Sequence, residues 1–287
     1  MISRNDFKIF DAHLHTYGMF LKPHEDVISY MDYYNVEKAI VTTINRTKYH
    51  SKQREHASGL NREENLSAYL NDFKNMMPKG QLSHQDVIDL ANKAPDRFYK
   101  FFWFNPNLSL EEEEDNYKIL ENHFKKGFIG VKIHASFNFF KFPKGVEKLV
   151  SFMQEFDKNF LLFIHSLPKT KFHDGSEPQD IAKLATKFPD LRIIVGHAAF
   201  CMEYAVSVGV LLKKFENVYF ETSCSVSLGI YSLIKTLGYK RMLFGSDSPT
   251  TSTLPIEIEK ILSLPRVSNE AKQDIFYNNV SNLLKFR

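Results

Sequence analysis

The sequence predicts a single-domain α/β protein of the TIM-type (β/α)8-barrel class, and three observations support this fold. Short apolar runs rich in Val, Ile and Phe recur eight times along the 287 residues, as expected for strands that are buried on both faces. Polar or amphipathic stretches separate the runs, and such strand–helix alternation indicates a parallel sheet. Polar residues end many of the runs, which a barrel with its site at the carboxyl ends of the strands explains better than an open sheet does.

The apolar runs give the positions of the eight expected strands. From the fourth run onward they follow one another at intervals of about 25–30 residues, the length of one βαβ unit. The expected strands are Phe7–Asp11, Lys38–Ile44, Phe98–Phe104, Gly127–His134, Phe160–His165, Leu191–His197, Val218–Thr222 and Met242–Asp247.

Helical patterns fill most of the intervals between these runs. Leu110–Lys126 opens on four glutamates and ends on two lysines, which suits a helix dipole, and Gly127 marks its end. Ser83 has a side chain that suits an N-cap. The remaining expected helices are His24–Asn35, Ser83–Lys93, Val146–Lys158, Pro178–Phe188, Met202–Phe215, Leu228–Leu237, Leu254–Leu262 and Asn269–Leu284.

One polar segment, residues 45–82, interrupts this alternation after the second strand. Its apolar content is too low for a core of its own, so we expect a partly helical, lid-like insertion on the active-site face rather than a second domain. The whole chain, residues 1–287, is therefore interpreted as one barrel domain.

Composition excludes several classes of protein. The formal net charge is +3, spread along the chain, which does not indicate a nucleic-acid-binding face. Two cysteines cannot form a disulfide framework, so a reducing compartment is expected. The N-terminal residues lack the pattern of a signal peptide, and the longest apolar runs are far shorter than the roughly 20 residues of a membrane span. We expect a cytoplasmic protein with a small-molecule substrate and no nucleic-acid or membrane partner, and a homodimer is a possible assembly.

Candidate metal ligands end four of the expected strands. The first strand ends in Asp11-Ala12-His13-Leu14-His15, and strict alternation would place Asp11, His13 and His15 on one face, with Phe10, Ala12 and Leu14 toward the helices. His165, His197 and Asp247 end the fifth, sixth and eighth strands. In a closed barrel these ends converge, and a cluster of imidazoles with a carboxylate suits zinc or another divalent ion.

The motifs DAHLH, GVKIH, FIHS, VGHAA and FGSDSP, in this order, resemble those of the amidohydrolase superfamily. The likeness is to its amidohydrolase-related (amidohydrolase 2) group of metal-dependent hydrolases, which also contains decarboxylases similar to aminocarboxymuconate semialdehyde decarboxylase. Residues 219–223 and 274–284 are similar to the group's seventh strand and closing helix. The resemblance spans nearly the whole chain and implies the barrel fold and a metal centre.

The resemblance also implies roles for individual residues. His13, His15, His165 and Asp247 match the metal ligands, and His197 matches the sixth-strand histidine, which lies beside the metal-bound water or substrate in one-metal members and is a ligand in two-metal members. The fourth strand ends in Lys132-Ile133-His134, without the acid found there in TatD-like nucleases. We expect one zinc ion, with two ions as the alternative.

Three further residues are candidates for substrate binding or for supporting the ligands. Lys132 could anchor a substrate carboxylate, carry a bridging carbamate or be a buried cation near Asp11. His134 could reach the cavity or cap the following loop. Asn105, at the end of the third strand, could bind substrate or satisfy the loop backbone.

The expected activity is hydrolysis of a small amide, lactone or ester by a zinc-activated water. Asp247 would take the proton of that water, and His197 would donate to the developing oxyanion or leaving group. The alternative is a metal-dependent decarboxylase of a small unsaturated or aromatic carboxylic acid. A barrel that binds but no longer catalyses, and a TatD-like nuclease, are less favoured.

Overall fold

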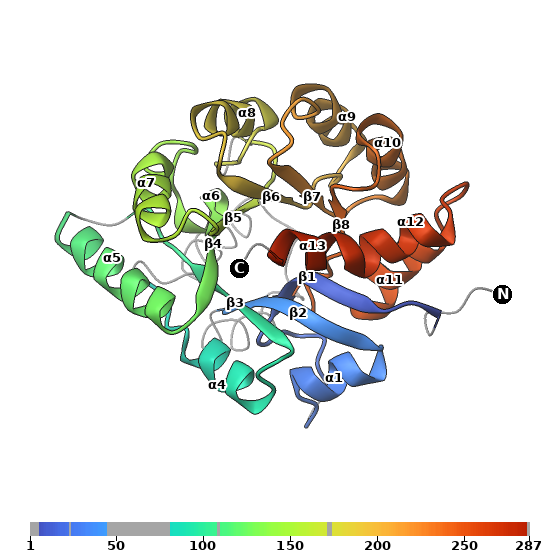
Figure 1. Ribbon diagram of the computed structural model, residues 1–287, viewed down its shortest axis with the longest axis horizontal. Helices are drawn as coiled ribbons and strands as arrows, with labels where there is room; N and C mark the ends of the chain where they lie inside the picture. The colour runs from blue at the N-terminus through green and yellow to red at the C-terminus, as the bar shows by residue number, and fades with distance from the viewer. Residues whose placement is uncertain (1–5, 23, 45–80, 108–109, 171–173, 286–287) are drawn as a thin grey trace, which may run out of the picture.

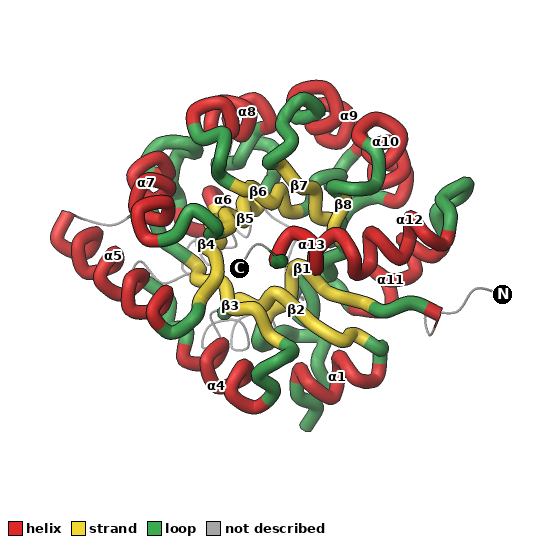
Figure 2. The backbone as a smooth tube through the Cα atoms, viewed as in Figure 1, coloured by secondary structure: helices red, strands yellow, loops and turns green. Residues whose placement is uncertain are grey.

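The computed structural model describes residues 6–22, 24–44, 81–107, 110–170 and 174–285. Eight parallel strands form one sheet in the order β1 to β8, and the helices lie outside it (Figure 1). The backbone trace shows the strands as an inner ring within a ring of helices (Figure 2). The predicted (β/α)8 barrel is confirmed. Most of the predicted lid-like insertion lies outside the described residues.

The strands follow the predicted order with small changes at their ends. They are β1 Ile9–His15, β2 Val36–Thr42, β3 Phe98–Trp103, β4 Phe128–His134, β5 Leu161–His165, β6 Arg192–Gly196, β7 Val218–Glu221 and β8 Met242–Leu243.

The helices also agree with the predicted pattern, although several are shorter. They are α1 Val27–Tyr33, α4 Gln85–Lys93, α5 Leu110–Lys125, α6 Ala135–Asn138, α7 Val146–Phe156, α8 Pro178–Lys187, α9 Met202–Leu211, α10 Ser227–Leu237, α11 Leu254–Leu262, α12 Asn269–Gln273 and α13 Asn279–Leu284, with a π-helical turn, η2 Asp274–Asn278, between the last two. His84, not Ser83, is the N-cap of α4. Within the described ranges, no helix is both long and apolar enough to cross a membrane.

The barrel closes between β1 and the segment that follows β8. The regular strand β8 has only two residues, but the chain continues beside β1 for five more, as far as Ser248. Ala12 N–H donates to the Phe244 carbonyl oxygen at 2.8 Å, and Asp247 N–H donates to the His13 carbonyl oxygen at 2.8 Å. His15 N–H donates to Ser248 in the same way, at 2.8 Å. These bonds hold Asp247 next to both histidines of β1.

A bulge in β1 overturns part of the predicted alternation. Asp11 pairs with Ala39 and Leu14 with Val41, so three steps along β1 match two along β2. Phe10 and Ala12 therefore pack inside the barrel, where we expected them to face the helices. Asp11 does not share the face of the two histidines: its carboxyl group accepts hydrogen bonds from Ser246 and from His13 N–H. Leu14 packs outward, as predicted.

The barrel interior is apolar at the end opposite the site. Phe10, Phe101 and Phe163 fill it together with Val280 and Leu283 of α13. This last helix lies across the opening of the ring in Figure 1, beside the C-terminus. The closed floor leaves the carboxyl ends of the strands as the end where a ligand can enter.

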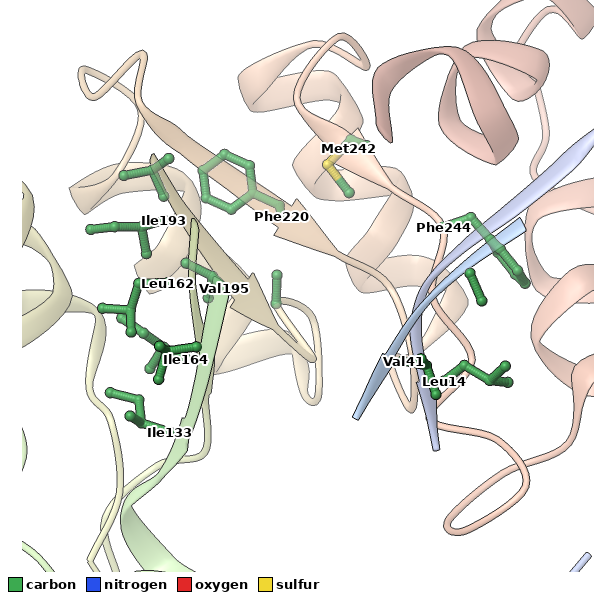
Figure 3. Close-up of a cluster of buried hydrophobic side chains, with 14 of the residues drawn as sticks. Leu14, Val41, Ile133, Leu162, Ile164, Ile193, Val195, Phe220, Met242 and Phe244 are labelled. Atoms are coloured by element: carbon green, nitrogen blue, oxygen red, sulfur yellow. The ribbon is translucent and has the colours of Figure 1, made fainter. Parts of the chain in front are cut away.

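A larger apolar layer joins the outer face of the sheet to the helices. The close-up in Figure 3 shows this layer, with side chains such as Ile133, Leu162, Ile193 and Phe220 projecting from successive strands. These residues are almost fully buried. At about 25 cal/mol per Å² of apolar surface, such burial is the main term that holds the strand ends in fixed positions.

Candidate metal centre and active site

A cavity of about 250 Å³ opens at the carboxyl ends of the strands. It receives side chains from strands and loops that are far apart in sequence, which is the usual position of a barrel active site. Its lining residues are His15, Ile44, Trp103, Lys132, His134, Ser136, Phe137, His165, Leu167, His197, Phe200, Cys224, Asp247, Thr250 and Thr251.

Two histidines, a lysine and an aspartate meet at the floor of this cavity. The Lys132 Nζ lies 2.6 Å from His13 Nε2 and 3.1 Å from His15 Nε2. Asp247 Oδ1 lies 3.0 Å from His15 Nε2 and 3.3 Å from His13 Nε2. All four side chains are buried. Two of the predicted ligands, His13 and His15, thus both lie within 3.3 Å of a third, Asp247.

The protonation of His15 shows why this cluster attracts a cation. His15 Nδ1 lies 3.2 Å from the Thr43 carbonyl oxygen, which can only accept, so the ring proton is on Nδ1 and Nε2 carries a lone pair. That lone pair faces the Asp247 carboxylate, and two acceptors so close repel unless a positive charge lies with them. The Lys132 ammonium supplies such a charge. Imidazole nitrogens and a carboxylate are also the donors that a divalent ion prefers, so these residues fit a metal centre.

The charges of the cluster are set by burial and by mutual contact. Burial by itself would raise the pKa of Asp247, but attraction to an imidazole that carries a positive charge, His13 first, lowers that pKa well below its usual range. Burial, followed by repulsion from Lys132, lowers the pKa of both His13 and His15. Burial also lowers the pKa of Lys132 to about 8, against the attraction of Asp247. The histidines are therefore neutral at pH 7, which is the form that binds metal.

His197 lies between the cluster and His165. Its Nε2 is 3.0 Å from His165 Nδ1 and 3.9 Å from Asp247 Oδ2. One ligand atom each from His13, His197 and Asp247 fall within 4.8 Å of one another. This grouping includes His197, which we expected beside a single ion rather than bound to it. The ligand roles of His165 and His197 stay predictions.

Aromatic rings form one wall of the cavity. His134 stacks on His165 with ring centroids 3.5 Å apart and on Phe137 with centroids 4.1 Å apart. Trp103 lies parallel to His134 at 5.6 Å. His134 Nδ1 also accepts the Phe137 N–H at 3.2 Å, so His134 both reaches the cavity and caps the loop. The wall suits a flat, unsaturated ligand.

Backbone conformation at the strand ends is unusual. His197 and Asp247 have φ angles of 56° and 52°, in the left-handed region that non-glycine residues seldom adopt. Such conformations cost of order 1 kcal/mol or more and persist where the surrounding contacts enforce them, most often at functional sites. Both residues turn sharply out of a strand here, which directs their side chains across the mouth of the barrel.

The remaining predicted residues have mixed outcomes. Lys132 faces Asp247 and the two histidines, so the suggested pairing with Asp11 is not the contact formed. The Asn105 side chain accepts the Asn107 N–H at 3.0 Å and is not part of the cavity lining described above. This hydrogen bond agrees with the second of the two roles expected for Asn105, which was to satisfy the loop backbone.

Sequence reasoning missed several residues of the site. Trp103 ends β3 and lines the cavity, and Cys224, to which the sequence analysis gave no role, lines it too. Glu221 ends β7 and Ser223 follows it, and both are fully buried behind the histidines. Burial raises the pKa of Glu221, while His197 and hydrogen bonds from Ser223 oppose the rise. The rule that polar residues at strand ends face the site would have found this pair.

Comparison with known proteins agrees with this geometry. The sequence profile of the amidohydrolase family matches residues 61–286, which is most of the chain. The chain belongs to the amidohydrolase family. It is thus a metal-dependent enzyme of the amidohydrolase superfamily, as the motifs indicated. No curated protein matches this amidohydrolase at a significant level.

Solved structures with the same fold include decarboxylases and a hydrolase. A 2,6-dihydroxybenzoate decarboxylase in complex with 2,6-dihydroxybenzoate has a TM-score of 0.60 and 14% identity, with 98% of each chain covered. A dihydroxybenzoic acid decarboxylase from a Polaromonas species, with bound manganese and the inhibitor 2-nitroresorcinol, has a TM-score of 0.58 and 15% identity over 96% of each chain. A probable 2-pyrone-4,6-dicarboxylic acid hydrolase from Acinetobacter baumannii has a TM-score of 0.56 and 13% identity, over 96% of this chain and 99% of that one.

Proposed function

We propose that this amidohydrolase is a metal-dependent decarboxylase of a small unsaturated or aromatic carboxylic acid. The observation that carries the proposal is the Lys132 ammonium, buried at the floor of a cavity with an aromatic wall. A carboxylate can pair with the ammonium while the attached ring lies against Trp103 and His134. The structural likeness to two decarboxylases supports the same reading over the hydrolysis expected first.

The residues of this cluster could hold the metal and carry the proton that such a reaction needs. His13, His15 and Asp247 would hold the metal, with His165 as the further predicted ligand. A bound divalent ion would act as a Lewis acid toward the oxygen atoms of the substrate. Loss of CO2 breaks the carbon–carbon bond to the carboxyl group, and the electron pair left on the ring carbon takes a proton. Asp247 and His197 are the groups placed to carry that proton.

Hydrolysis is the second candidate, and the position of Asp247 favours it. Asp247 Oδ2 lies 3.9 Å from His197 Nε2, so the carboxylate can accept a proton from an attacking water while His197 assists the leaving group. The likeness to a pyrone dicarboxylic acid hydrolase also supports this candidate. The identity of the metal as zinc and the presence of a single ion stay predictions in either case. The Polaromonas decarboxylase described above holds manganese.

One experiment separates the two reactions. Protein purified without added metal is analysed for its metal content, and is then loaded with Mn2+ or Zn2+ and assayed on hydroxylated benzoic acids and on lactones. A decarboxylase releases CO2 and, in D2O, leaves one deuterium on the carbon that carried the carboxyl group. The Asp247→Asn variant is the control for contaminating activity. Acid release from lactones without CO2 release from any acid would replace this proposal with the hydrolase.

A further inference from the structure

A buried serine and glutamate lie behind the metal centre. Glu221 is the last residue of β7 and Ser223 lies two positions after it, and neither is a predicted ligand. Ser223 Oγ donates to Glu221 Oε2 at 2.9 Å, and Glu221 also accepts the backbone N–H of Ser223. Ser223 Oγ lies 3.2 Å from His13 Nδ1 and 2.9 Å from His197 Nδ1. One serine thus touches both imidazoles on the side away from the cavity.

The hydrogen-bond partners decide where the protons lie. The Glu221 carboxylate oxygens accept hydrogen bonds from the His197 backbone N–H at 3.1 Å and from the backbone N–H and hydroxyl of Ser223. The Ser223 hydroxyl proton is therefore directed to Glu221, and Ser223 Oγ is left as an acceptor for His13 Nδ1–H. His197 Nδ1 also lies 3.0 Å from the Ser223 carbonyl oxygen, which can only accept. Both imidazoles consequently carry the proton on Nδ1.

We propose that Ser223, oriented by Glu221, is a positioning residue that fixes the tautomer and the orientation of His13, so that its Nε2 lone pair faces the metal centre. The Ser223 carbonyl oxygen does the same for His197. The inference goes beyond the proposed function and applies equally to a decarboxylase and a hydrolase.

The effect on the metal follows from general chemistry. Partners that hold the second ring nitrogen of a ligating histidine orient the ring and raise its basicity, and their loss typically costs about 10- to 100-fold in metal affinity. Glu221 adds a negative charge 3.4 Å from His13 Nδ1, which favours positive charge on the far side of the ring. The Ser223→Ala variant loses only the hydroxyl, so His13 is affected and His197 keeps its carbonyl partner.

The test measures Zn2+ affinity of the metal-free protein by competition with a chelator. The Ser223→Ala variant is expected to bind Zn2+ about 10- to 100-fold more weakly than wild type. Ser225→Ala is the matched control, because Ser225 is a buried serine of the same loop whose hydroxyl contacts the Ala199 N–H and the Ser223 carbonyl but no imidazole. Glu221→Gln keeps the shape, removes the charge and is also expected to weaken binding.

A second readout begins with the wild-type protein, so its main result does not depend on any variant being stable. In wild-type protein with 15N-labelled histidine, ring-nitrogen chemical shifts report whether Nδ1 or Nε2 is protonated. We expect Nδ1–H for His13 and His197, and in Ser223→Ala a change at His13 alone. A proton on Nε2 of His13 in the metal-free wild type, or equal Zn2+ affinities in Ser223→Ala and Ser225→Ala, would overturn the inference. Neither readout involves substrate. A negative result for Ser223 therefore leaves the proposed decarboxylation unaffected, and absence of decarboxylation would leave the proposed role of Ser223 unaffected.

Discussion

Gly245→Ala tests how tightly Glu221 is held behind the metal centre. A Cβ atom at position 245 would lie 2.1 Å from Glu221 Oε1 and 2.6 Å from its Cδ. Non-bonded carbon atoms are comfortable at roughly 3.5–4.0 Å, so the glutamate must retreat by about 1 Å or more. That movement breaks its hydrogen bonds to His197 N–H and to Ser223.

The expected loss of stability is large for a single methyl group. Overpacking costs roughly 1–3 kcal/mol, and each hydrogen bond to a charged group contributes roughly 1.5–3 kcal/mol. Allowing for relaxation, we expect the free energy of unfolding to fall by about 3–5 kcal/mol. Urea unfolding of the metal-free protein measures this directly, since at a slope of about 3 kcal/mol/M the midpoint moves by roughly 1–1.7 M.

Two controls isolate the clash with Glu221. Gly238 has a φ of 76° and open space around its missing Cβ, so Gly238→Ala shows the cost of backbone strain alone, about 1 kcal/mol. The double variant Gly245→Ala/Glu221→Ala should be no less stable than Glu221→Ala, because the clashing side chain is gone. A Gly245→Ala protein as stable as Gly238→Ala, or additive costs in the double variant, would refute the reasoning.

The other predictions concern the substrate, the proton and the pH. Lys132→Met should lower kcat/KM by about 10- to 150-fold through loss of a charged hydrogen bond, with the bound metal retained; steady-state kinetics with metal analysis checks both, and unchanged kinetics would remove Lys132 as an anchor. His197→Asn should lower kcat by about 10²- to 10⁴-fold in folded protein; loss of metal alongside activity would make His197 a ligand. Burial lowers the pKa of His84 well below 6.5, so below about pH 6.5 the unfolded chain binds a proton that the folded protein does not, and stability falls as the pH falls. His84→Gln should reduce that fall by up to about 1.4 kcal/mol per pH unit, measured by urea unfolding from pH 7 to pH 5, and an unchanged slope would show that His84 titrates normally.

The sequence by itself determined the barrel and the identity of the residues around its mouth. Apolar runs and turn signals are local features, so the strand order and helices such as α8 and α11 could be predicted to within a few residues. In a parallel barrel every strand points the same way, so His15, His165 and Asp247 had to meet at one end. The family followed from the order of the same motifs.

Only the tertiary structure decided which way side chains face and what they touch. The bulge in β1 depends on pairing with β2, and it turned Phe10 and Ala12 inward and Asp11 toward Ser246, against simple alternation. The partners of Lys132 could not be assigned from sequence. The side chain reaches across the barrel to His13 and His15, which precede it in the chain by 119 and 117 positions. The contact between Ser223 and His13 joins residues 210 positions apart. Local patterns specify elements, whereas the contacts that tune a metal site form across the barrel and exist only once it has closed.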